Sequence, residues 1–209
     1  MKKFVFLIPL FSLLFFSACT QKQAPVEECS LTGGDCQSGS WIVDHSNLSG
    51  AIDDVLLALK NNDMQTLSTF VWTQWLRFSP YEHVNISTDI VLTTEVVANA
   101  LSISAAYTWG AYDGSGEPMT LWIGQYFDRF VTDADWATAP EVNYNQITQR
   151  WNIINNIVQV YPWKQTAEFY FSGFDPQYGG MDRKSLTLVF QQENGQWYLI
   201  GIVHGSRTI

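Results

Sequence analysis

Hydrophobic and polar residues alternate along the C-terminal third of the chain, a pattern that predicts β-strands. Three segments follow this period of two, at residues 167–171, 185–192 and 196–204. Asn194-Gly195 lies between the last two segments and is the strongest short hairpin signal, because both turn positions need a positive φ. The last two strands are therefore expected to pair as a hairpin.

The turn sets the register of this hairpin and places Phe190 opposite Leu199 and Ser185 opposite His204. One face is then apolar and should contact the helices; its members are Leu186, Leu188, Phe190, Leu199 and Val203. The other face is mixed and should be half-wet or meet a partner. Its members are Thr187, Val189, Gln191, Tyr198, Ile200, Ile202 and His204.

The spacing changes to that of helices in the N-terminal half. Behind Ser49, a candidate N-cap, apolar residues recur at i, i+3, i+4 and i+7: Ile52, Val55, Leu56 and Leu59. Asp63 is expected to cap a second short helix, whose apolar face comprises Met64, Leu67, Phe70 and Val71. The pattern further predicts helices over 93–101, 120–131 and 152–160, a turn or short strand at 77–81, and a loop at 112–118.

Helices first and an antiparallel meander last is the pattern of the α+β class. The order of elements over residues 45–209 resembles the NTF2-like (cystatin-like) cone. In that fold a long helix lies across a curved sheet and leaves a pocket at the open end. The resemblance implies N-terminal helices packed on a C-terminal antiparallel sheet.

The first twenty residues have the pattern of a secretory signal. Lys2 and Lys3 precede an apolar run over 4–16, which is too short to span a bilayer of ~30 Å, and Ser17-Ala18-Cys19 follows. This arrangement resembles a bacterial lipoprotein lipobox, which implies cleavage before Cys19 and acylation of that residue. We therefore expect a signal peptide at 1–18, a polar tether at 19–40 and one α+β domain at 41–209.

The expected location is extracytoplasmic, with the lipid of Cys19 as the membrane partner. Position 20 is Thr, whereas an Asp directly after the acylated Cys would resemble an inner-membrane retention signal. The outer membrane is therefore expected if the cell has one. Cys29 and Cys36 form an even pair in an oxidising compartment, with Gly33-Gly34 between them to turn the chain. A disulfide is favoured over two free thiols.

Charge excludes one class of partner. The 209 residues hold 11 Lys and Arg against 20 Asp and Glu, a net charge of −9 with pI ≈ 4.6. Nucleic acid would be repelled at long range, so no nucleic-acid partner is expected. Nine Trp and an aromatic content of 15% argue against disorder.

Six strings are similar to those of a family of uncharacterised bacterial lipoproteins and secreted proteins. They are ALKNNDMQTLSTFV, RFSPY, YTWGAYDGSGEP, NNIVQVYP, GFDPQYGGMDRKSLTLVF and NGQWYLIGIVHG, in this order. The resemblance implies an identity without an established activity. It departs at Arg183, where the family often has an aromatic, and at 205–207, where it has more acidic or aromatic residues.

Candidate catalytic chemistry is sparse. His204 is the best candidate for a working imidazole, as an acid/base with Asp175 or Asp113, and Asp182 lies in the same loop as Asp175. The alternative is a strand-end His bonded to the backbone. Neither HExxH nor GxSxG occurs, and the DGSGE segment from Asp113 has Gly124 where a calcium loop needs Glu. No metal or cofactor is predicted.

Polar and aromatic residues beside turns suggest a non-catalytic site for a small molecule, glycan or peptide. They are Arg77, Tyr81, Tyr107, Trp109, Asp113 and His204. A binding or scaffolding module is therefore the favoured hypothesis. Two alternatives stay open: a small NTF2-like enzyme using the His/Asp pair, and a structural envelope protein that associates through its sheet.

Overall fold

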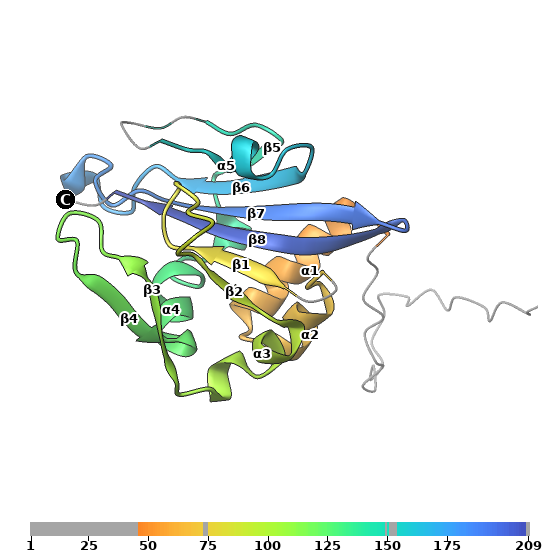
Figure 1. Cartoon of the computed structure of the whole chain (residues 1–209). Helices are drawn as coiled ribbons and strands as arrows, with labels where there is room; N and C mark the ends of the chain where they lie inside the picture. The colour runs from red at the N-terminus through yellow and green to blue at the C-terminus, as the bar shows by residue number, and fades with distance from the viewer. Residues whose placement is uncertain (1–45, 73–74, 149, 151–153, 208–209) are drawn as a thin grey trace, which may run out of the picture. The chain divides into compact units, whose positions relative to one another are not determined.

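The computed structural model describes residues 46–72, 75–148, 150 and 154–207. The predictions on the signal peptide, the tether, the lipid site at Cys19 and the Cys29–Cys36 pair lie outside these residues. Within them the chain is a mixed α+β fold with one six-stranded sheet and a separate two-stranded hairpin. Figure 1 shows the helices α1 to α4 on one side of the large sheet.

The large sheet has the order β2-β1-β8-β7-β6-β5 and is mostly antiparallel. Its strands are β1 (Leu76–Ser79), β2 (Ile90–Leu92), β5 (Glu141–Tyr144), β6 (Gln165–Phe171), β7 (Lys184–Glu193) and β8 (Gln196–Ser206). β1 runs parallel to β8, which the sequence pattern did not predict. The small hairpin pairs β3 (Ala106–Ala111) with β4 (Pro118–Trp122).

The helices are α1 (Leu48–Lys60), α2 (Met64–Thr69), α3 (Thr94–Ala98), α4 (Ile123–Phe130) and α5 (Ile157–Val160). Short 3₁₀ turns lie at Ala100–Ser102, Trp136–Thr138 and Pro176–Tyr178. The N-cap of α1 is Asn47 rather than Ser49, and its side chain accepts from the Ser49 N–H. Asp63 caps α2 as predicted, with its Oδ1 3.0 Å from the Thr66 nitrogen.

The predicted helix over 120–131 is wrong in its first three residues. Thr120 and Leu121 belong to β4, where Thr120 pairs with Thr108 and Leu121 with Tyr107. Pairing with a strand that the sequence pattern missed overrides the local spacing, because strand propensity depends on its neighbours. The helix α4 begins only at Ile123.

The hairpin β7–β8 confirms the predicted turn but not the whole register. Asn194 and Gly195 have φ of 51° and 80°, and Phe190 pairs with Leu199. A β-bulge then places Gly201 opposite Val189 and His204 opposite Leu186 instead of Ser185. An extra residue in one strand moves every later side chain of that strand to the opposite face.

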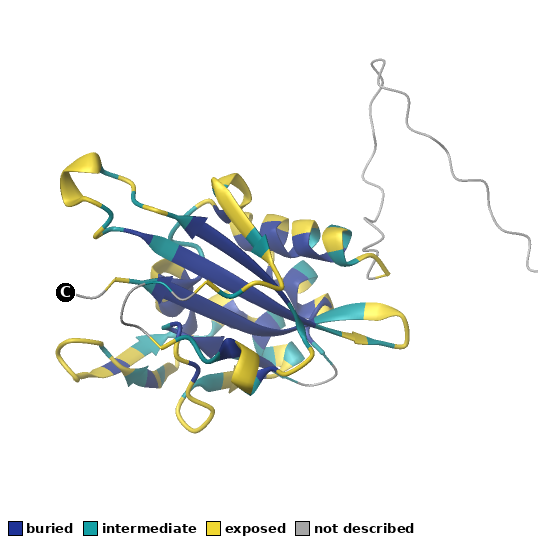
Figure 2. Cartoon of the chain, turned by 90° about the horizontal axis from the view of Figure 1, so that it is seen from above, coloured by how far each residue is buried: buried dark blue, intermediate teal, exposed yellow. Residues whose placement is uncertain are grey.

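The bulge decides which residues meet the helices. Ile202 joins the main core with Leu186, Leu188 and Leu199, whereas Val203 lies in a second cluster with Val189 and Ile200 on the other face. That second cluster also contains Val84, which follows β1, and Ile157 and Tyr161, which belong to α5 and its C-cap. Figure 2 shows the resulting dark, buried band along the central strands.

No helix among the described residues is both long and apolar enough to cross a bilayer.

Candidate functional site

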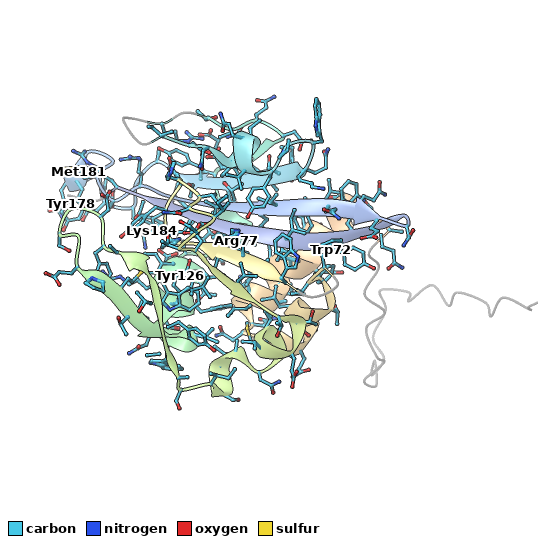
Figure 3. The ribbon with its side chains drawn as sticks, in the orientation of Figure 1. Trp72, Arg77, Tyr126, Tyr178, Met181 and Lys184 are labelled. Carbon is cyan, nitrogen blue, oxygen red and sulfur yellow. The ribbon has the colours of Figure 1, made fainter. Side chains whose placement is uncertain are left out.

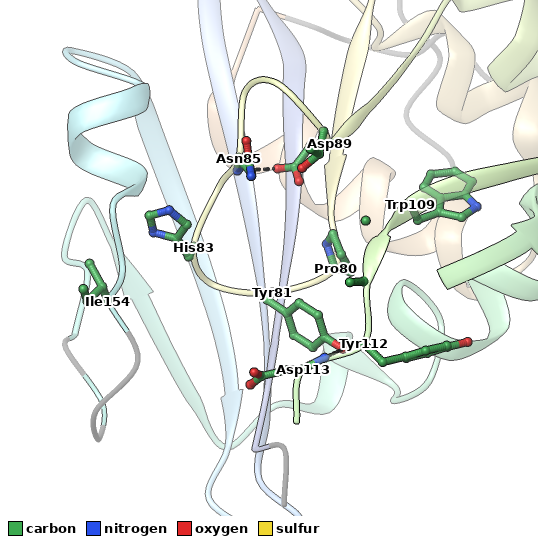
Figure 4. A pocket seen from close by; sticks show the side chains of 12 residues that line it. Pro80, Tyr81, His83, Asn85, Asp89, Trp109, Tyr112, Asp113 and Ile154 are labelled. Atoms are coloured by element: carbon green, nitrogen blue, oxygen red, sulfur yellow. Dashed lines mark hydrogen bonds between the residues drawn. The ribbon is translucent and has the colours of Figure 1, made fainter. Parts of the chain in front are cut away.

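Two adjoining cavities open where β1, β8 and the β3–β4 hairpin meet. The first, called here the Asp89 pocket, measures about 630 Å³. It is lined by Pro80, Tyr81, His83, Asn85, Thr88, Asp89, Trp109, Gly110, Ala111, Tyr112, Asp113 and Ile154 (Figure 4). The second, called here the Lys184 cleft, measures about 500 Å³. It is lined by Tyr81, Tyr112, Asp113, Ser115, Arg129, Phe130, Asp133, Lys184, His204, Ser206 and Arg207.

Tyr81, Tyr112 and Asp113 line both cavities and form the wall between them. The Asp113 backbone N–H donates to Tyr81 Oη at 3.0 Å, which ties the β3–β4 turn to the end of β1. Burial raises the pKa of Tyr81, and the nearby Asp113 charge raises it further against the lowering effect of that hydrogen bond. Tyr81 is therefore neutral, with a hydroxyl proton left to donate.

The opposite wall of the Asp89 pocket is a loop held by one carboxylate. Asp89 Oδ2 accepts from Ser79 Oγ at 2.5 Å and from the Asn85 N–H at 2.8 Å. Burial raises the pKa of Asp89, and the two hydrogen bonds offset only part of that effect. Figure 4 shows Asn85 and Asp89 facing each other across the loop.

Arg77, which was predicted to bind ligand, contacts this loop. Its Nη1 donates to the carbonyls of Ile86 at 3.4 Å and Asp89 at 3.5 Å. The side chain lines neither cavity. It lies next to Phe78 in β1, and successive strand residues point to opposite faces, so Phe78 enters the main core while Arg77 points away from it.

Trp109 and Tyr107, which were also predicted to bind ligand, are packed against other aromatic rings. Trp109 is 0% exposed, stacks on Tyr126 with centroids 3.8 Å apart, and donates its Nε1–H to the Leu121 carbonyl at 2.9 Å. It lines the Asp89 pocket as a side chain that is packed into the core. Tyr107 packs beside Trp109, with ring centroids 5.9 Å apart, and lines neither cavity. The aromatic rings that line the Lys184 cleft are those of Tyr81, Tyr112 and Phe130, together with the imidazole of His204.

His204 lies at the base of the Lys184 cleft, but its partners are not the predicted ones. The ring is 2% exposed, with Nδ1 3.2 Å from the Pro80 carbonyl and Nε2 3.3 Å from Asp133 Oδ2. Phe130 and Trp136 pack edge-on against it. Asp175 instead accepts from Gln177, and Asp182 accepts from the N–H groups of Phe174 and Asp175. The bulge in β8 aims His204 into the core rather than at that loop.

Both nitrogens of His204 lie beside protein oxygens, those of the Pro80 carbonyl and the Asp133 carboxylate, so both are engaged within the protein. Asp133 also receives the Lys184 ammonium at 2.6 Å. Burial raises the pKa of Asp133, but the hydrogen bonds and charges of His204 and Lys184 outweigh it and hold that pKa below its usual value.

A second polar cluster lies on the other face of the same strands, and sequence reasoning missed it. It holds Glu82, Glu168, Arg150 and Arg183, of which Glu82, Glu168 and Arg183 are buried. Arg150 contacts Glu168 at 3.2 Å and lies 3.5 Å from the centroid of the Tyr170 ring. Burial and the Glu168 charge raise the pKa of Glu82 to about 7, against the lowering charges of Arg183 and Arg150. Only the tertiary fold brings these residues together.

Lys184 and its neighbour Arg183 belong to different sites, the Lys184 cleft and the buried cluster of Glu82 and Glu168. Lys184 pairs with Ser206 at the end of β7 and points into the cleft, whereas Arg183 belongs to the buried cluster. Figure 3 places Lys184 near one end of the sheet and Trp72 toward the other.

Within the part of the chain that the structure describes, no three His, Cys, Asp or Glu side chains gather as metal ligands would.

Comparisons with known proteins add no function. No protein-family model matches the chain, and no curated protein matches it. Among solved structures, a DUF4783 family protein from Bacteroides ovatus overlaps 75% of this chain and 94% of its own. The identity is 9% and the TM-score 0.34, an overlap too slight to assign a fold.

Proposed function

We propose that the chain is a lipid-anchored, extracytoplasmic binding module of the NTF2-like type, which holds a small ligand without chemical conversion. One observation carries the proposal: the Asp89 pocket and the Lys184 cleft lie side by side and share Tyr81, Tyr112 and Asp113 as their common wall. Their volumes of about 630 and 500 Å³ are those of small-molecule sites. A glycan, peptide or small organic molecule would fit.

The geometry of His204 favours binding over catalysis. An acid/base must reach a substrate and exchange a proton with it. His204 is 2% exposed, and both of its nitrogens are engaged by Pro80 and Asp133. Neither Asp113 nor Asp175 contacts the ring through any hydrogen bond of the described residues. The ring supports the floor of the cleft.

The sheet offers little support for the alternative of a structural envelope protein. That alternative needs an exposed apolar sheet face. In β7 and β8 the second face carries Val189, Ile200 and Val203, which are 0%, 2% and 1% exposed.

Replacing Tyr112 by Ala tests the site. We expect a panel of oligosaccharides, tripeptides and organic acids to yield a compound that raises the melting temperature of the full chain. At 100 times its Kd, the compound should raise the free energy of unfolding by about 2.7 kcal/mol. Tyr112→Ala should weaken its affinity about tenfold or more, because the shared wall is lost. Thermal shift followed by calorimetric titration measures both.

Tyr144→Ala is the matched control, since Tyr144 is 54% exposed on β5 and lines neither cavity. Its affinity should equal that of the wild type. A panel without any binder, or equal losses in the two variants, would contradict the proposed site.

Anchoring is tested at Cys19. Expressed in a bacterium, the chain should enter the membrane fraction, and mass spectrometry should find an acylated Cys19 as its first residue. Cys19→Ala should leave the protein soluble or unprocessed, whereas Cys29→Ala should stay in the membrane fraction. An unmodified amino terminus in the wild type would remove the proposed anchor.

A further inference from the structure

We infer that the ligand of this site carries a carboxylate or phosphate group, and that Arg129 and Lys184 bind this group in the Lys184 cleft. The inference rests on the binding function proposed above and names the chemical class of the ligand. It starts from charge: the chain holds 20 acidic against 11 basic residues, yet three of those 11, Arg129, Lys184 and Arg207, line this one cleft.

Two carboxylates, those of Asp113 and Asp133, line the cleft against these three cations. The side chain of Asp133 is 9% exposed, and its Oδ2 is engaged by Lys184 at 2.6 Å and by His204 at 3.3 Å. The Lys184 ammonium also donates to the Asp133 carbonyl at 3.3 Å, and it lies 5.6 Å from the centroid of the Phe174 ring. Two of its three N–H groups are engaged by Asp133, and the third has no hydrogen-bond acceptor among the described residues. The Lys184 side chain is 30% exposed, so a ligand can reach it.

Arg129 is held in place by an aromatic ring rather than by an acid. Its guanidinium carbon lies 4.7 Å from the centroid of Tyr112, and its Nη1 lies 3.4 Å from Tyr112 Oη. Among the described residues no carboxylate oxygen lies within 4.0 Å of its nitrogens. A stacked guanidinium keeps its planar fork of N–H donors, which matches the two oxygens of a carboxylate or phosphate.

Neutral donors surround the same space. The hydroxyls of Ser115 and Ser206 line the cleft, and Tyr81 Oη, which accepts from the Asp113 N–H, still has its own proton to donate. The Asp89 pocket adjoins this space on the other side of Tyr81, Tyr112 and Asp113. With a net charge of −9, the chain as a whole repels anions, so these local cations must provide the attraction.

The test compares matched sugars by calorimetric titration of the full chain at fixed ionic strength. Glucuronate and glucose 6-phosphate should bind and glucose should not, and inorganic phosphate should compete. Which of the two anionic sugars binds more tightly distinguishes a carboxylate ligand from a phosphate ligand. Arg129→Gln should weaken the binding about tenfold or more, because a charge-assisted bidentate contact is lost.

Lys164→Gln is the control, because it removes one positive charge from a residue that lines neither cavity. It should leave the affinity unchanged. Equal losses in Arg129→Gln and Lys164→Gln, or no binding of either anionic sugar, would overturn the inference. If a neutral ligand binds with dependence on Tyr112 but not on Arg129, the inference fails while the proposed binding function stands.

Discussion

Glu82→Gln is expected to raise the free energy of unfolding by about 3 kcal/mol at pH 8 and to change it little at pH 4. The effect follows from a carboxyl group that is 7% exposed and packs against Gly205, where an added Cβ would meet both Glu82 Oε1 and Ser185 Oγ. Burial in this space, with Glu168 on the same face, raises the pKa of Glu82 from 4.5 to about 7, although Arg183 and Arg150 oppose the shift.

The sign follows from linkage. A carboxyl whose pKa is raised in the folded state takes up a proton more readily there than in the unfolded state. Its contribution to stability is therefore fully present below pH 4.5 and is lost as the pH rises through about 7. The difference between a pKa of 4.5 and one of about 7 corresponds to about 3 kcal/mol. Gln keeps the shape of the side chain and does not ionise, so the variant does not lose this stability as the pH rises.

Chemical denaturation between pH 4 and pH 8 measures this effect as the difference between variant and wild type. Glu117→Gln serves as the control, since Glu117 is exposed in the β3–β4 turn and should change stability by less than about 0.5 kcal/mol. A Glu82→Gln protein that is less stable than the wild type at pH 8 would show that the Glu82 charge contributes net attraction to the arginines.

Asp133→Ala is expected to lower the free energy of unfolding by about 3–5 kcal/mol at pH 7. The substitution removes the acceptor of Lys184 at 2.6 Å and of His204 at 3.3 Å, and it leaves a 2% exposed ring with one nitrogen unsatisfied. Asp135→Ala is the matched control. Asp135 pairs with Lys60 at 2.8 Å, but both side chains are largely in solvent, so its loss should be below about 1 kcal/mol.

The pH dependence of Asp133 is opposite to that of Glu82. Because the folded state holds the pKa of Asp133 below its usual value, its contribution is present above the unfolded pKa and is lost as the pH falls through the folded one. The gap between wild type and Asp133→Ala should therefore close in acid. Denaturation curves at pH 7 and pH 3 measure it, and a gap that is equal at both pH values would contradict this role.

Several elements could be predicted because their signals are local. The apolar stripe of α1, the Asp63 cap of α2 and the Asn194-Gly195 turn each depend on residues within a few positions of one another. The α+β class follows from their order. At the site, Tyr81, Asp113 and His204 were predicted to lie together, and all three line the Lys184 cleft.

Other residues of the site could not be predicted, because their contacts join distant segments. Asp133 and His204 are 71 positions apart, and the cluster of Glu82, Glu168 and Arg183 gathers three further segments. Trp109 stands beside a glycine turn in sequence, which made exposure plausible, yet Tyr126 and Leu121 bury it completely. Arg129 lies in an amphipathic helix, and nothing in that pattern indicates a Tyr112 ring beneath it.

Sequence alone determined the periods, caps and turn that define the elements, since these depend on backbone geometry and on neighbours along the chain. Tertiary structure alone decided the β8 bulge, which reversed the faces of Ile202, Val203 and His204. Both faces of this sheet are covered, so β8 has apolar residues on each of them. A one-residue shift therefore still places apolar residues on both faces. The choice between registers therefore depends on which side chains the helices and loops bring to each face.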